Sequence, residues 1–101
     1  MKAPKFTRIV NRKRYSTETA TLIADDVFWD GHNFERNGRN TWLYRTPNGR
    51  YFTVTCSQWQ GERDSLEPIS KGDAIDLYEN ELPEHEVDYA EAFPDVVVED
   101  A

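Results

Sequence analysis

Side chains suited to acid–base, nucleophilic or metal chemistry are few in this chain and lie far apart in the sequence. The two histidines, His32 and His85, have no second His or Cys at metal-site spacing. Cys56, the one cysteine, falls on the predicted core face of a strand, where a thiol without a neighbouring base is unreactive. We therefore expect no catalytic residues, and the chain is not predicted to be an enzyme.

Three aspartates lie close together in sequence and invite a metal interpretation. Asp25, Asp26 and Asp30 could hold Mg²⁺ as a carboxylate cluster. The structural interpretation is stronger, because Asp25-Asp26 interrupts a β-branched stretch as a bulge does and Asp30-Gly31 is a turn signal. No Walker-type or dinucleotide-binding glycine pattern occurs. We predict neither a metal nor a cofactor, and leave the carboxylate cluster open as an alternative.

The N-terminal segment is basic. Residues 1–17 hold six Lys or Arg and no acid. Cations beside an aromatic ring can hold phosphates while the ring stacks on a base. A net charge of -7 argues against a dedicated nucleic-acid domain, and cations also protect an edge strand from unwanted pairing. A nucleic-acid-binding module is therefore the alternative hypothesis, and its candidate residues are Arg8, Arg12, Lys13, Arg14 and Tyr15.

The C-terminal part is acidic. Residues 62–101 hold fourteen Asp or Glu against Arg63 and Lys71. These carboxylates fit a solvated surface, a surface that binds a basic protein, or a mimic of nucleic-acid phosphates. Trp59 beside Arg63 resembles a protein-binding anchor, although Trp59 folding back over the sheet edge explains it as well. The candidate protein-binding residues are Trp59, Arg63, Glu79, Glu81, Glu84 and Glu86.

The leading hypothesis is a small non-enzymatic interaction module that binds a protein through these residues. It would be an accessory or inhibitory protein of a mobile element. One cysteine fits a reducing cytoplasm, and no run of 18 apolar residues or secretory-type leader occurs. At 101 residues and 13% aromatic, we expect one folded domain over residues 1–95 and an acidic tail over 96–101.

A β-hairpin over residues 41–56 is the element around which the rest can be placed. A three-residue loop with Gly49 in the left-handed position pairs Tyr44 with Phe52 and Trp42 with Val54. One face then carries Trp42, Tyr44, Phe52, Val54 and Cys56. The other carries Thr41, Leu43, Arg45, Tyr51, Thr53 and Thr55. If helices cover the Trp42 face, the second face meets solvent or a partner, and a homodimer becomes a reasonable expectation.

Other elements follow from turn and capping signals. Residues 6–15 predict a short hairpin turning at Asn11-Arg12, and residues 19–29 a strand that bulges at the acidic pair. Residues 66–69 predict an edge strand that tolerates Pro68. Ser70 and Asp88 are predicted helix N-caps, and Pro83 and Pro94 end these helices. The expected fold is α+β, with an antiparallel sheet of four to five strands and one or two C-terminal helices on one face.

Three segments resemble a family of small, poorly characterised prokaryotic proteins found in chromosomes and on mobile elements. They are KRYSTETA at 13–20, LYRTPNGRYF at 43–52 and EPISKGDA at 67–74. The family favours Gly where this chain has Arg12 and Asp where it has Ser16. The resemblance implies a compact domain with an unassigned function, and it carries over no catalytic residue.

Overall fold

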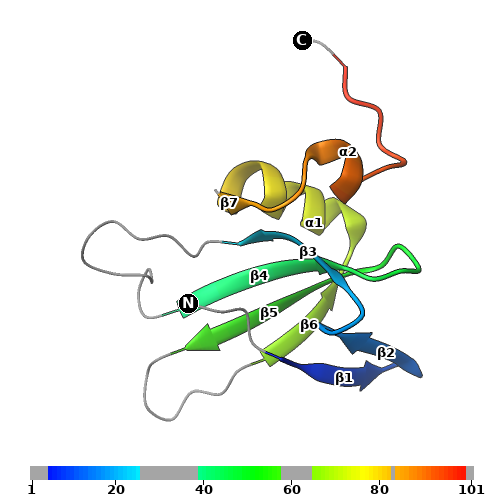
Figure 1. Ribbon diagram of the computed structural model, residues 1–101, viewed down its shortest axis with the longest axis vertical. Coiled ribbons are helices and arrows are strands. Elements are labelled where there is room, and N and C mark those ends of the chain that lie inside the picture. The colour runs from blue at the N-terminus through cyan, green and yellow to red at the C-terminus, as the bar shows by residue number, and fades with distance from the viewer. Residues whose placement is uncertain (1–4, 26–38, 58–64, 83, 100–101) are drawn as a thin grey trace.

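A five-stranded antiparallel sheet lies at the centre of a computed structural model of the chain, which describes residues 5–25, 39–57, 65–82 and 84–99 (Figure 1). Its strand order is β6 (Ser65–Ile69), β5 (Tyr51–Ser57), β4 (Arg39–Arg45), β3 (Thr21–Asp25) and β7 (Glu84–His85). A separate two-stranded hairpin is formed by β1 (Thr7–Val10) and β2 (Lys13–Ser16). With the C-terminal helices, this confirms the predicted α+β fold.

The central hairpin has the predicted register. Trp42 lies opposite Val54, and Tyr44 lies opposite Phe52. The loop closes through a 2.8 Å hydrogen bond from the Thr46 amide to the Arg50 carbonyl, and Gly49 has a φ of 81°. A side chain at this φ would clash with the backbone, so glycine fits the third loop position.

The first hairpin turns where the sequence predicted, at the cost of an unfavourable backbone conformation. Val10 lies opposite Lys13, so only Asn11 and Arg12 form the turn. Their φ angles are 52° and 66°. Positive φ at both central positions is the turn that matches the twist of the strands, and Asn tolerates it better than Arg. Arg12 therefore stores local strain in a turn that glycine would form freely.

Two further strands agree with prediction in position and differ in detail. A bulge in β3 falls between Leu22 and Ala24. The bulge predicted at Asp25-Asp26 is not tested, because residues 26–29 of the predicted strand lie outside the described residues. The extra residue there is Ile23, which is fully buried, and Asp25 remains paired with Trp42. Strand β6 is an edge strand as predicted, with Pro68 opposite Phe52.

Both helices begin at the predicted caps. The side chain of Ser70 accepts a 3.1 Å bond from the Asp73 amide, and Asp88 accepts a 2.9 Å bond from the Glu91 amide. Helix α1 (Lys71–Asp76) continues into a π-type turn, η1 (Leu77–Glu81), and α2 spans Tyr89–Ala92. The turn closes through a 2.8 Å bond from the Leu82 amide to the Leu77 carbonyl, next to Pro83. A proline cannot continue a helix, which explains the end of the first one.

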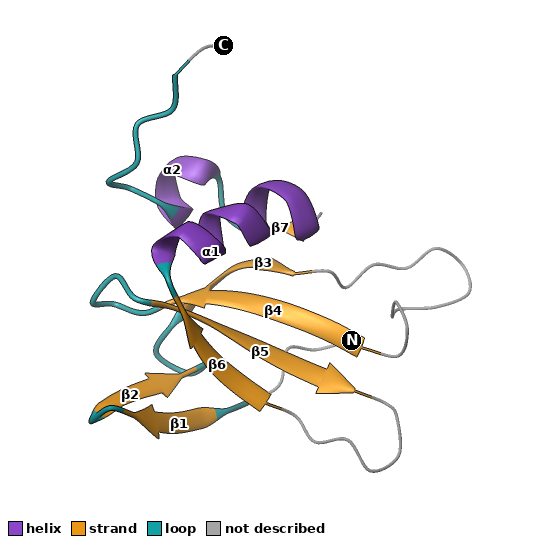
Figure 2. Ribbon diagram, turned by 180° about the vertical axis from the view of Figure 1, so that it is seen from behind, coloured by secondary structure: helices purple, strands orange, loops and turns teal. Residues whose placement is uncertain are grey.

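The two faces of the sheet pack against different partners, and the premise that helices cover the Trp42 face is wrong. The helical layer covers the other face, where Leu43 and Tyr51 pack with Ala74, Tyr78 and Phe93. The β1–β2 hairpin covers the Trp42 face, where Tyr15, Val10 and the preceding Phe6 pack against it. Figure 2 shows the helices and this hairpin on opposite sides of the sheet. The half-apolar face that suggested a homodimer is therefore buried within the chain.

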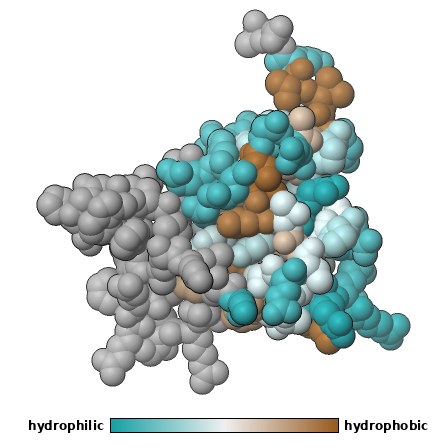
Figure 3. Space-filling view, in the orientation of Figure 1, coloured by the Kyte–Doolittle hydropathy of each residue, from teal (hydrophilic) through white to brown (hydrophobic). Residues whose placement is uncertain are grey.

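The C-terminal segment leaves the helical layer after Phe93. Val97 and Val98 are 84% and 69% exposed, and no described residue beyond α2 joins a strand. Figure 3 shows apolar atoms on this projecting segment. Residues 97–99 of the predicted tail therefore extend without strand pairing, whereas Val96 packs partly against the helical core. Among the described residues, no helix is both long and apolar enough to cross a membrane.

Candidate functional site

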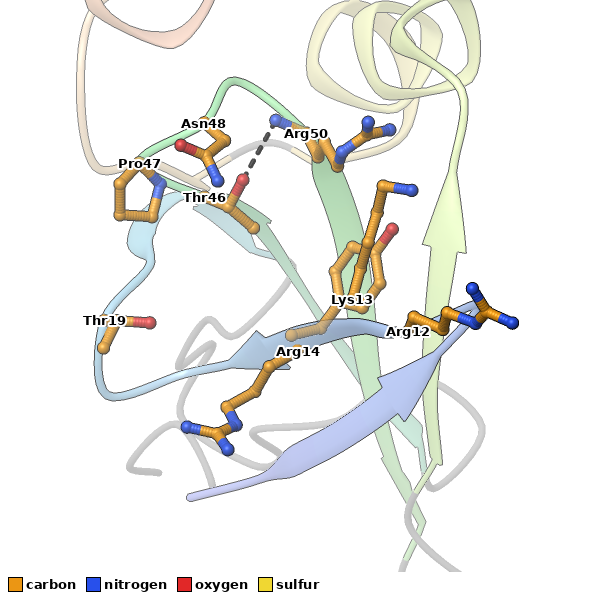
Figure 4. Close-up of a pocket in the computed structure, with 9 residues that line it drawn as sticks. Arg12, Lys13, Arg14, Thr19, Thr46, Pro47, Asn48 and Arg50 are labelled. Carbon is orange, nitrogen blue, oxygen red and sulfur yellow. Dashed lines mark hydrogen bonds between the residues drawn. The ribbon is translucent and has the colours of Figure 1, made fainter.

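A basic pocket lies between the turn of the β1–β2 hairpin and the turn of the β4–β5 hairpin (Figure 4). Its volume is about 610 Å³. The residues that line this basic pocket are Arg12, Lys13, Arg14, Tyr15, Thr19, Thr46, Pro47, Asn48 and Arg50. Two turns that are distant in sequence therefore build one concave surface.

The lining of the basic pocket is cationic. Four of its nine residues carry a positive charge, and none carries a negative charge. All four cations are exposed. In Figure 4, Lys13 and Arg50 extend toward the same side, whereas Arg12 and Arg14 reach toward opposite sides. This spread suits an extended anion with several charged groups better than a single small anion.

The β4–β5 turn gives the basic pocket a fixed wall. Thr46 is buried, and its hydroxyl accepts a 3.0 Å hydrogen bond from the Arg50 amide. The Thr46 carbonyl also accepts a 2.9 Å bond from the Gly49 amide. Because these bonds lie within the turn, Asn48 and Arg50 project from a rigid frame and leave their exposed side chains to a ligand.

The structure separates the five predicted nucleic-acid-binding residues into two groups. Arg12, Lys13 and Arg14 line the basic pocket. Arg8 instead donates a 2.7 Å bond to the Leu66 carbonyl and lies 3.5 Å from a carboxylate oxygen of Glu67, which fastens β1 to the edge strand β6.

Tyr15 lines the basic pocket but does not offer a free ring. It is 6% exposed, and its ring meets Phe52 edge-on with centroids 5.7 Å apart. A ring packed in this way belongs to the core between hairpin and sheet. The predicted stacking of Tyr15 on a base is therefore wrong, and its role is to hold the basic strand β2 against the sheet.

The predicted acidic protein-binding residues fall on the helical side of the molecule where they are described. Glu79, Glu81, Glu84 and Glu86 are all exposed. Glu79 accepts a 2.8 Å hydrogen bond from the Tyr89 hydroxyl, which raises the pKa of that phenol. Trp59 and Arg63 lie outside the described residues, so the aromatic part of this surface stays a prediction.

The remaining candidates for chemistry do not converge. Cys56 is buried in the core on the Trp42 face, as expected. His85 stacks on Tyr78 with ring centroids 3.8 Å apart, and its Nε2 lies 2.7 Å from the Tyr78 carbonyl. Asp25 is buried, whereas Asp26, Asp30 and His32 lie outside the described residues. Within residues 5–25, 39–57, 65–82 and 84–99, no three His, Cys, Asp or Glu side chains gather as metal ligands do.

Burial of Tyr44 in the core perturbs the ionisation of its phenol. Desolvation raises the pKa of Tyr44 to about 12, and the negative charges of Asp25 and Cys56 add to the effect. Tyr44 stacks on Phe52 with ring centroids 5.0 Å apart, so this phenol belongs to the packed interior. We assign it a structural role.

No protein-family model, no curated protein and no solved structure matches the chain. The resemblance to small prokaryotic proteins therefore remains a prediction from three sequence segments.

Half of the basic pocket was not anticipated from the sequence. In the sequence, Thr46, Pro47, Asn48 and Arg50 predict only a hairpin turn, and Thr19 gives no signal for a site. The positive charge of Arg50 directly after the turn is the one signal that could have suggested that this turn also lines a basic pocket.

Proposed function

We propose that the protein is a non-enzymatic module that binds a nucleic-acid strand through its phosphates in the basic pocket. The observation that supports this proposal is that Arg12, Lys13, Arg14 and Arg50 line one pocket whose lining contains no acid. Arginine and lysine are the residues that neutralise nucleic-acid phosphates. Because Tyr15 is packed in the core, we expect the phosphate contacts to dominate, with little preference for base sequence.

The acidic net charge does not oppose this proposal. The exposed glutamates Glu79, Glu81, Glu84 and Glu86 belong to the helical side, and the β1–β2 hairpin lies on the opposite side of the sheet (Figure 2). At physiological ionic strength, charges more than roughly 8 Å apart are largely screened when exposed to solvent. A strand at the basic pocket therefore experiences mainly the local cations.

A second candidate function is the binding of a basic protein by the acidic helical side. Its specific support is the exposure of all four predicted glutamates, of which Glu79 and Glu81 lie in η1 and Glu84 and Glu86 lie between η1 and α2. Reversal of the charges at Glu84 and Glu86, whose side chains have no part in the contacts described above, should weaken capture of such a partner. Unchanged capture by the charge-reversed protein would remove this candidate.

The proposed function is tested by single charge reversals on the two turns. We expect Arg14→Glu and Arg50→Glu each to weaken binding of a labelled single-stranded oligonucleotide by about tenfold, because a phosphate contact is replaced by repulsion. Arg50→Glu is the more informative variant, since Arg50 lies 36 positions after Arg14 in sequence but in the same pocket. Fluorescence anisotropy at low salt gives the dissociation constants.

Lys5→Glu provides the matched control. Lys5 belongs to the same basic N-terminal segment and is exposed, but it does not line the basic pocket. The substitution changes the net charge by the same amount as Arg14→Glu. We expect it to leave binding nearly unchanged, whereas equal losses in all three variants would show that only overall charge matters and would contradict a localised site.

A further inference from the structure

A second cavity lies on the other side of the β4–β5 turn. Its volume is about 410 Å³. Asn48 lines both this cavity and the basic pocket, so a single turn separates them. The residues that line this second cavity, called the Arg45 cavity below, are Arg45, Asn48, Gly49, Tyr51, Lys71, Pro94 and Asp95.

Arg45 lines the Arg45 cavity, and its guanidinium group includes a donor that has no hydrogen-bond partner. Its Nε atom is buried and has no hydrogen-bond partner. The guanidinium group lies under the turn, since a Cβ atom at Gly49 would be 3.8 Å from its Nη2. A buried donor without a partner is uncommon because its desolvation is not offset, and a guanidinium group is built to bind oxyanions.

The anion that the Arg45 cavity now holds belongs to the chain itself. Asp95 forms an ion pair with Lys71, which lowers the pKa of the Asp95 carboxyl, and the charge of Arg45 adds to this effect. The Asp95 side chain is 70% exposed, so the carboxylate lies at the rim of the cavity and can be displaced. Exposed ion pairs of this kind contribute little to stability.

The segment that carries Asp95 is held on both sides of this residue. Phe93 is fully buried before it, and Val96 after it packs partly against the core and donates a 3.1 Å bond from its amide to the Phe93 carbonyl. Beyond Val96, Val97 and Val98 are exposed. Rotation of the exposed Asp95 side chain alone would withdraw the carboxylate and leave both anchors in place.

We infer that the Arg45 cavity is a phosphate-binding site in which Asp95 takes the place of the phosphate group. Lys71 supplies an ammonium group and Arg45 a guanidinium group, both from the lining of the cavity. The Asp95 carboxylate of the C-terminal segment competes with the ligand for these two cationic groups. Where the ligand is a nucleic-acid strand, this site extends the basic pocket past Asn48, and that extension rests on the proposed function.

The site is tested with inorganic phosphate and the Nε–Hε resonance of Arg45, a reporter within the cavity itself. We expect phosphate to shift this resonance in the wild-type protein and to do so at about fivefold lower concentration in Asp95→Ala, because one competing negative charge is removed at contact distance. Asp95→Asn, which keeps the shape of the side chain, should also lower the phosphate concentration needed to shift the resonance. Lys71→Met combined with Asp95→Ala should abolish the gain.

The opposite results would overturn the inference. Equal phosphate affinity in the wild-type and both Asp95 variants would show that Asp95 does not compete for the site. Shifts confined to the Nε–Hε resonances of Arg12, Arg14 and Arg50 would place phosphate in the basic pocket alone.

Oligonucleotide binding separates this inference from the proposed function. If Arg50→Glu abolishes oligonucleotide binding while Asp95→Ala leaves the wild-type affinity unchanged, the proposed function stands and the second site fails. If no oligonucleotide binds but phosphate still shifts the Arg45 resonance more readily in Asp95→Ala, the second site stands and the proposed function fails.

Discussion

The hydroxyl of Tyr51 on β5 donates a 2.9 Å hydrogen bond to the main-chain carbonyl of Ala92 in α2. Both residues are buried, and the Tyr51 ring also packs against Phe93 with centroids 5.3 Å apart. This contact joins the central hairpin to the last helix across the core. The segment that carries Asp95 follows directly after Phe93, so the same contact places Asp95 next to Lys71.

Tyr51→Phe should destabilise the protein by about 1–2 kcal/mol, because it leaves the buried Ala92 carbonyl without its partner. Urea denaturation followed by circular dichroism measures the free energy of unfolding. Tyr89→Phe is the matched control, since it removes an exposed bond to Glu79. Tyr89→Phe should lower the free energy of unfolding by much less than Tyr51→Phe. Equal losses would show that the buried hydrogen bond stabilises the protein no more than the exposed one.

Arg12→Gly should stabilise the fold and weaken ligand binding together. Glycine adopts the φ of 66° without strain, which we expect to raise the free energy of unfolding by about 0.5–1 kcal/mol after the added freedom of the unfolded chain is subtracted. The same substitution removes one cation from the basic pocket. Thermal denaturation and oligonucleotide affinity measure the two effects, and a variant that is both less stable and equally good at binding would contradict them.

Ser70→Ala should destabilise the protein by about 1 kcal/mol, because the Asp73 amide loses the side-chain oxygen that caps α1. Ser70→Asp keeps an acceptor at the same position and should restore most of the loss. Denaturant titration of the three proteins decides between the outcomes. Equal stability of the alanine and aspartate variants would show that the cap is not used.

Stability should fall in alkaline solution as buried phenols ionise. The folded-state pKa of Tyr44 is about 12, above the ordinary value of 10.0. A raised pKa contributes stability that is fully present below the ordinary value and is lost as the pH rises through the folded value. We therefore expect the free energy of unfolding to decrease between pH 10 and 12. The loss that Tyr44 contributes is roughly 3 kcal/mol when complete.

Tyr44→Phe tests the assignment of this alkaline loss. The variant should show a flatter decrease over the same pH range, although Tyr78 and Tyr89, whose pKa values are also raised, continue to contribute. Tyrosinate absorbance measures the ionisation directly. A Tyr44 phenol that titrates near its ordinary value would contradict its burial.

Local sequence signals predicted the local structure well. The Pro47-Asn48-Gly49 loop determines the hairpin register, because only the three-residue loop keeps Trp42, Tyr44 and Phe52 together on one face. Ser70 and Asp88 cap helices as predicted, because an oxygen at that position satisfies an amide that the helix leaves free. These features depend on neighbours within a few residues.

The choice of packing partner was not accessible from local signals. Both faces of the hairpin carry large side chains, Trp42 and Phe52 on one and Leu43 and Tyr51 on the other, so the pattern does not distinguish the helix-covered face. The short strand β7 was also missed. Two exposed residues, Glu84 and His85, pair with β3 without any hydrophobic pattern of their own.

The basic pocket was predicted only in part, because one of its two sides is brought into place by packing between distant residues. The basic residues of β2 and its turn stand out in sequence, but the approach of the β4–β5 turn follows from how the first hairpin docks on the sheet. That docking depends on Tyr15 packing against Phe52, a contact between residues 37 positions apart. This contact is what brings Arg50 and Asn48 to the same pocket as the basic residues of β2.

Salt dependence of oligonucleotide binding is the most direct measurement of the central claim. A site with four cations should give a log–log slope of affinity against salt of up to about -3, at roughly 0.7 per phosphate contact on a single strand. Arg50→Glu should make this slope shallower by about 0.7, whereas Lys5→Glu should leave it unchanged. A slope near zero, or the same slope for the wild-type and Arg50→Glu proteins, would contradict phosphate binding in the basic pocket.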